Sequence, residues 1–77
     1  MTVYHWTTEK RAEEILKKGL RKWSFICRRP EDWRGEVCLS IELDYEIDWD
    51  NRDEHAKWQG IVHTAISPKK ISRLASL

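Results

Sequence analysis

Hydrophobic and polar positions near the start of the chain predict a short strand followed by an amphipathic helix. Residues 3–6 are β-branched or aromatic apart from one histidine, which is typical of a strand. Over residues 8–18 the apolar positions fall on one stripe at helical spacing. Thr7 or Thr8 can cap the start of this helix, and Gly19 can end it in a left-handed conformation. We therefore expect a strand that turns directly into a helix.

A second strand is predicted over residues 36–43, where apolar and polar residues alternate without exception apart from one cysteine. One face of this strand carries Val37, Leu39, Ile41 and Leu43, and the other carries Glu36, Cys38, Ser40 and Glu42. A short strand within residues 21–27 would place Trp23, Phe25 and Cys27 together. Residues 28–35 contain a proline and a glycine and are predicted to form a loop.

The last third of the chain has a weaker pattern. Residues 44–58 are acidic and show no decisive period, so we expect a loop followed by a short helix over residues 52–58. Residues 60–66 are predicted to form a strand. Ser67 and Pro68 are suited to begin a final helical turn over residues 69–74.

These elements predict a single α+β domain over residues 1–77, with a small mixed or antiparallel sheet of about four strands packed on the helix of residues 8–18. Seventy-seven residues leave room for only a thin core. Five tryptophans are many for such a core, so we expect some at a surface that meets a partner or a second copy in a homodimer.

Composition narrows the classes of function. The net charge of +1 gives no general basic excess of the kind that nucleic-acid binding produces. No run of about twenty apolar residues predicts a membrane span, and no secretory signal is evident, so a cytoplasmic location is expected. Cys27 and Cys38 have neither disulfide-framework nor zinc-ligand spacing. We expect no metal site and interpret both cysteines as small core residues.

His5 is the first candidate for a functional residue, although a lone histidine at a strand end is more often structural. Here His5 precedes Thr7 and a helix that closes in Ile15-Leu16-x-x-Gly19-Leu20. This opening resembles the ADP-ribosyltransferase-like fold, in particular the RNA 2′-phosphotransferases and the DarT-type DNA-modifying toxins. The resemblance implies that His5 contacts the ribose of NAD and that Thr7 lies near the nicotinamide.

Two later stretches are similar to the same families. Val37-Cys38-Leu39-Ser40 resembles their central strand, which implies a ligand contact for Ser40. The stretch from Gln59-Gly60-Ile61-Val62 to Ile66-Ser67-Pro68 resembles their late strand and turn. Aligned in this way, Gln59 stands at the position of the catalytic glutamate. A glutamine supplies no negative charge to the transition state, so we expect a shortened, degenerate member that binds NAD or a related nucleotide without efficient transfer.

Two other classes of function stay open. One is a protein-binding module, such as a phage or mobile-element inhibitor, that uses its tryptophans and the acidic stretch of residues 44–54. The other is a nucleic-acid-binding accessory, which would use the basic residues of 17–22, Arg28 and Arg29 with Trp23 and Trp33 for stacking. The near-zero net charge disfavours this last class.

Overall fold

The structure is a computed structural model, and it describes residues 1–47, 49 and 59–74. Its elements, in chain order, are β1 (Thr2–Thr7), α1 (Glu9–Lys18), β2 (Phe25–Cys27), the 3-10 turn η1 (Pro30–Asp32), β3 (Val37–Glu42), β4 (Gln59–Ile61), the 3-10 turn η2 (Pro68–Lys70) and β5 (Ile71–Arg73). They form a small α+β fold, as the sequence predicted. The helix expected over residues 52–58 lies outside the described residues.

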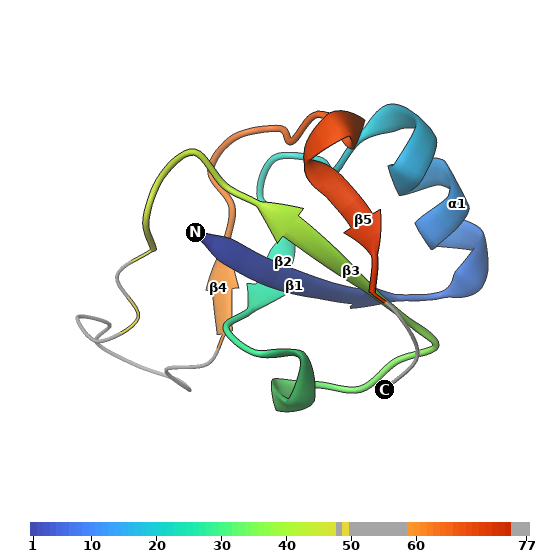
Figure 1. The fold of residues 1–77 in the computed structure, drawn as a ribbon, viewed down its shortest axis with the longest axis horizontal. Coiled ribbons are helices and arrows are strands. Elements are labelled where there is room, and N and C mark those ends of the chain that lie inside the picture. Colours follow the sequence, from blue (N-terminus) through green and yellow to red (C-terminus); the bar gives the residue numbers. More distant parts are fainter. Residues whose placement is uncertain (48, 50–58, 75–77) are drawn as a thin grey trace.

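The five strands form one antiparallel sheet in the order β4-β2-β1-β3-β5. The longest pairing joins β1 to β3, from Thr2 opposite Glu42 to Thr7 opposite Val37. Figure 1 shows α1 on one side of this sheet and η1 on the other. The predicted number of strands was about four, and the additional strand is β5.

The core lies between the sheet and α1. It contains Val3, Ala12, Leu20, Ile26, Val37, Leu39, Ile41, Leu43, Trp49, Val62, Ile66 and Ile71. Because side chains alternate along a strand, Val3, Leu39 and Ile41 share the face that α1 covers. We call this the helix face of the sheet and the opposite one the η1 face.

Helix α1 begins and ends where the sequence predicted. The Thr8 hydroxyl accepts a hydrogen bond from the Arg11 backbone N–H at 3.2 Å, so Thr8 is the N-cap. At the other end the Gly19 N–H donates to the Ile15 carbonyl at 2.7 Å. Gly19 has φ 96° and ψ 176°, which is an extended conformation of positive φ rather than the left-handed helical one that we expected.

Two predicted strands are shorter in the structure. Of residues 21–27 only Phe25–Cys27 is strand, because Trp23 has φ 73° and turns the chain. Of residues 60–66 only the first part continues β4, which spans Gln59–Ile61. Val62 then exchanges hydrogen bonds with Trp23 and Ser24, and Ile66 forms an isolated bridge with Leu20. Turns therefore replace the first part of the strand predicted over residues 21–27 and the last part of the strand predicted over residues 60–66.

The final helical turn predicted over residues 69–74 is wrong in its extent. Ser67 caps a single 3-10 turn through the Lys69 N–H, and the chain becomes extended at Ile71. Ile71 is buried opposite Ile41, so pairing with β3 stabilises this segment more than a longer helix would. On β3 itself, Cys38 is buried on the face predicted to be polar, and both cysteines are core residues as expected.

Candidate functional site

The sheet register places the four predicted site residues on two different faces. His5 and Thr7 lie opposite Leu39 and Val37 and belong to the helix face. Ser40 lies opposite Tyr4 and therefore belongs to the η1 face. Gln59 also belongs to the η1 face, because it pairs with Cys27, which pairs in turn with Tyr4.

His5 is fixed by one hydrogen bond to the neighbouring strand. Its Nδ1 atom lies 2.6 Å from the carbonyl oxygen of Phe25. A carbonyl can only accept, so Nδ1 carries the hydrogen and donates it. In a neutral His5 ring, Nε2 is then left with a lone pair that can accept from a ligand hydroxyl. The strand register that brings Phe25 next to His5 thus determines the tautomer.

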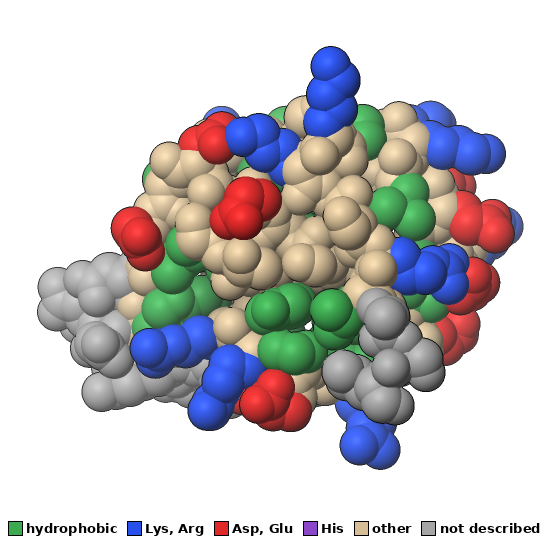
Figure 2. Space-filling model, viewed as in Figure 1, with side chains coloured by type: hydrophobic (Ala, Val, Ile, Leu, Met, Phe, Trp, Pro, Cys, Tyr) green, Lys and Arg blue, Asp and Glu red, His purple; other side chains and the backbone are tan. Residues whose placement is uncertain are grey.

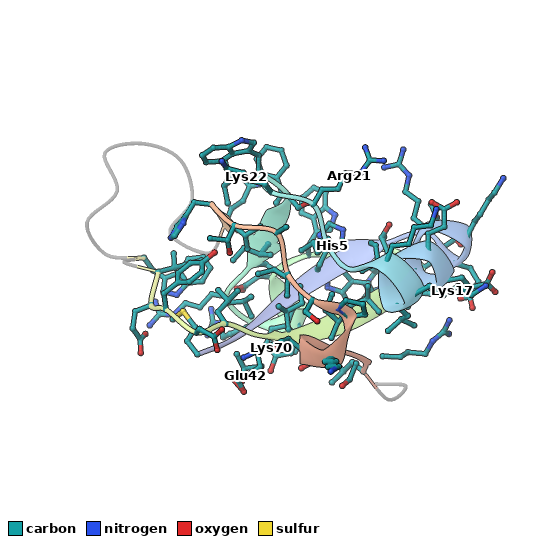
Figure 3. All side chains as sticks on the ribbon, turned by 90° about the horizontal axis from the view of Figure 1, so that it is seen from above. His5, Lys17, Arg21, Lys22, Glu42 and Lys70 are labelled. Atoms are coloured by element: carbon teal, nitrogen blue, oxygen red, sulfur yellow. The ribbon has the colours of Figure 1, made fainter. Side chains whose placement is uncertain are left out.

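A cavity of about 620 Å³ lies beside His5 on the helix face. We call it the His5 cavity. Its wall is formed by the end of β1, by α1 and by the segment that leads to β2, and it contains His5, Trp6, Thr7, Arg11, Glu14, Ile15, Lys18, Gly19, Leu20, Arg21, Ser24 and Phe25. Figure 3 shows His5 near the middle of the molecule, with Arg21 and Lys22 on the neighbouring segment. The volume is within the range of small-molecule sites.

The His5 cavity carries an excess of positive charge. Arg11, Lys18 and Arg21 contribute cations, and Glu14 contributes the single carboxylate among the lining residues. In the described part of the chain, no carboxylate forms an ion pair with any of these three cations. Arginine binds phosphate oxygens through two parallel N–H groups, and lysine adds a point charge. The cavity therefore suits an anionic ligand.

One end of the His5 cavity depends on the contact between Gly19, Leu20 and Ile66. Leu20 and Ile66 exchange two backbone hydrogen bonds, both of 2.9 Å. A Cβ atom on Gly19 would lie 2.2 Å from the Ile66 carbonyl oxygen. Glycine is needed here for both its positive φ and this close approach.

A second, smaller cavity of about 210 Å³ opens on the η1 face. We call it the aromatic cavity, and it is lined by Tyr4, His5, Trp6, Phe25, Ile26, Cys27, Trp33 and Gln59. Figure 2 shows hydrophobic side chains gathered between β1 and η1, with charged side chains of both signs beside them. Gln59 thus lies at a different cavity from Thr7, whereas His5, Trp6 and Phe25 contribute to both.

Ser40 lies apart from both cavities. It is flanked by Tyr4 on β1 and Ser72 on β5, and it lines neither the His5 cavity nor the aromatic cavity. The structure therefore brings His5 together with Thr7 at the His5 cavity and with Gln59 at the aromatic cavity, and it places Ser40 at neither.

Sequence reasoning missed several residues of these cavities. Arg11 and Glu14 look like ordinary solvent-facing positions of an amphipathic helix. Their cavity role depends on the segment of residues 20–24 folding beside α1, which no local pattern signals. Tyr4 and Phe25 are separated by twenty-one positions and meet only through strand pairing.

Both thiols are shielded from water. Burial and the nearby Cys38, Asp32 and Glu31 raise the pKa of the Cys27 thiol to about 12. Burial raises the pKa of the Cys38 thiol to about 11. Both are neutral near pH 7, so neither is a reactive nucleophile.

The described residues contain no group of three or more histidine, cysteine or acidic side chains arranged to hold a metal ion. In residues 1–47, 49 and 59–74, no helix has the length and apolar character needed to cross a membrane. Comparison with protein-family models, with curated proteins and with solved structures gave no match to this chain.

Proposed function

We propose that this chain binds NAD or a related nucleotide in the His5 cavity, as a minimal ADP-ribosyltransferase-like domain without efficient transfer. The observation that carries the proposal is the convergence on one cavity of about 620 Å³ of His5, Thr7 and three cations that pair with no carboxylate of the described residues. The Nε2 atom of His5 can accept a hydrogen bond from a ribose hydroxyl, because Nδ1 is engaged by Phe25. Arg11, Lys18 and Arg21 supply the charge that a diphosphate needs.

The proposal of weak or absent transfer rests on Gln59. Its amide carries no charge with which to stabilise an oxocarbenium-like transition state. Its side chain also belongs to the sheet face opposite that of His5 and Thr7. Gln59 does not line the His5 cavity, so a ligand that contacts both His5 and Thr7 there lies at a different cavity from Gln59. Both features favour binding over group transfer.

The binding test is a titration with NAD that follows tryptophan fluorescence, since Trp6 adjoins His5 and lines the same cavity. We expect a saturable change for the wild-type protein and its loss in His5→Ala. Lys18→Glu and Lys17→Glu form a matched pair, because both change an exposed lysine of α1 but only Lys18 lines the cavity. Lys18→Glu should weaken binding and Lys17→Glu should not. Absence of a saturable change at millimolar NAD would refute the proposal.

A protein-binding module remains the second candidate function. It is favoured by four large hydrophobic side chains with high exposure, namely Trp23 (62%), Trp33 (59%), Phe25 (58%) and Ile61 (42%). Phe25 and Ile61 are directly paired across β2 and β4, so their side chains form one apolar surface. Size-exclusion chromatography with light scattering tests the homodimer form of this proposal. A monomer at all concentrations would eliminate that form.

A further inference from the structure

The aromatic cavity has walls from three separate segments of the chain. Tyr4 and Trp6 come from β1, Phe25 from β2 and Trp33 from the loop after η1. By the strand register, Tyr4 and Trp6 point to the η1 face. Cys27 pairs with Tyr4 on one side and with Gln59 on the other, and it points to the same face. The Trp6 indole N–H donates to the Pro30 carbonyl at 2.8 Å, which holds the ring under the η1 segment. Four aromatic side chains thus line an open cavity of about 210 Å³.

Two carboxylates, those of Glu31 and Asp32, directly precede the cavity-lining Trp33 in the chain. Asp32 and Glu31, on η1, are the charged residues that raise the pKa of the cavity-lining Cys27 thiol. The Asp32 carboxylate is held in place by the Arg29 backbone N–H at 2.9 Å and has only 9% of its side chain exposed. The Arg29 guanidinium pairs with the same carboxylate, but it is itself 66% exposed and extends into solvent. Neither carboxylate lines the cavity itself, but both act on the Cys27 thiol in its wall, which disfavours an anionic ligand there.

Aromatic walls with carboxylates behind them favour an organic cation. The faces of aromatic rings carry partial negative charge and attract a cation within about 6 Å of the ring centre. A bare ammonium group is strongly hydrated, and removing that water in an apolar cavity is unfavourable. Methylation reduces this hydration while leaving the charge. We propose that the aromatic cavity binds a methylated ammonium group, as found in choline or in trimethylated lysine.

This site shares His5, Trp6 and Phe25 with the nucleotide site proposed above, but each cavity also has lining residues of its own. Trp33 lines only the aromatic cavity, and Arg11 and Arg21 line only the His5 cavity. Loss of NAD binding and loss of cation binding are therefore measured with different variants, and either can occur without the other.

The test is a titration with choline followed through backbone amide shifts in NMR spectra, with its uncharged isostere 3,3-dimethyl-1-butanol as the control ligand. We expect saturable shifts at Tyr4, Phe25 and Trp33 with choline and binding at least about fivefold weaker with the isostere. Equal affinity for the two ligands would overturn the proposal, because the cavity would then recognise only apolar shape. No saturable shift at tens of millimolar choline would overturn it as well.

Substitutions test whether choline binds in the aromatic cavity. Trp33→Ala should weaken choline binding about fivefold or more. Trp23→Ala is the matched control, because Trp23 is equally exposed but does not line the cavity, and it should bind as the wild type does. Asp32→Asn keeps the acceptor for the Arg29 N–H and removes the charge, so it should weaken choline binding and leave the isostere unaffected. Equal effects of the two tryptophan variants, or no effect of Asp32→Asn, would contradict the proposal.

Two sources of the cation are separated by a further comparison. A peptide with trimethyllysine binding more tightly than choline identifies a modified protein as the source. Choline binding at least as tightly as the peptide identifies a free or lipid-borne head group. The unmodified lysine peptide should bind more weakly than the trimethylated one, and equal binding of the two peptides would overturn the proposal.

Discussion

Replacing Gly19 by alanine should destabilise the protein more than a surface glycine replacement normally does. Gly19 has φ 96°, and a Cβ atom there would lie 2.2 Å from the Ile66 carbonyl oxygen. Positive φ costs a residue with a side chain about 1–2 kcal/mol. To relieve the clash, the segment of Ile66 must move, and the two hydrogen bonds with Leu20 are then weakened at about 1 kcal/mol each.

Alanine also reduces the entropy of the unfolded chain, which offsets about 0.5–1 kcal/mol of this loss. The expected net loss in the free energy of unfolding is therefore about 2–3 kcal/mol. Equilibrium urea unfolding measures it, and the denaturant slope should be unchanged if both proteins unfold in two states.

Gly35→Ala is the matched control. Gly35 does not have positive φ, and a Cβ atom there would be 3.3 Å from the Trp6 Cβ, a contact that small shifts relieve. Its loss should stay within about 1 kcal/mol. If Gly19→Ala were no more destabilising than Gly35→Ala, the account of the Leu20–Ile66 contact would be refuted.

Three further predictions concern the helix cap, the core and the thiols. Thr8→Ala removes the acceptor of the Arg11 N–H and should cost about 1 kcal/mol in thermal unfolding, whereas Thr8→Ser should cost much less. Leu39→Ala removes a fully buried side chain at the centre of β3 and should cost about 3 kcal/mol in urea unfolding; a loss below about 1 kcal/mol would mean that this position is not in the core. The pKa of the Cys27 thiol is about 12 in the folded protein, against 9.0 for a free thiol, so the unfolded chain loses its proton first as pH rises. The Cys27 thiol should therefore stabilise the folded protein fully below pH 9 and progressively less toward pH 12. Over this range the free energy of unfolding of Cys27→Ala should decline less than that of the wild type.

Local patterns were sufficient to predict β1, α1 and β3. Helix α1 is amphipathic, is capped by Thr8 and ends before Gly19, and each of these features depends on near neighbours in the sequence. Strand β3 alternates regularly because one of its faces packs against the helix. The class of fold and the main helix therefore follow from the residues alone.

Long-range pairing determined what the sequence did not predict. Residues 71–73 have no strong strand pattern, and β5 exists because Ile71 pairs with Ile41 on the exposed edge of β3. Trp23 leaves the strand conformation because the chain turns there to meet Val62. Neither contact has a local signal. The sequence therefore did not predict β5, and the strands predicted over residues 21–27 and 60–66 were too long.

The candidate site was predictable in part for the same reason. The spacing of His5 and Thr7 on one strand places both side chains on one face, and the structure places both at one cavity. Whether Ser40 and Gln59 share a sheet face with His5 depends on the register between strands, and a one-residue shift in register exchanges the two faces. The basic residues of the cavity come from two segments that fold together only in three dimensions.

The most direct test of the nucleotide proposal is an NMR titration of the intact protein with NAD. Backbone amide shifts show which residues meet the ligand. The account predicts saturable shifts at His5, Thr7, Arg11, Gly19 and Arg21, with Ser40 and Ser72 unchanged on the other side of the sheet. Shifts centred on Ser40, or no saturable shift at millimolar NAD, would contradict it.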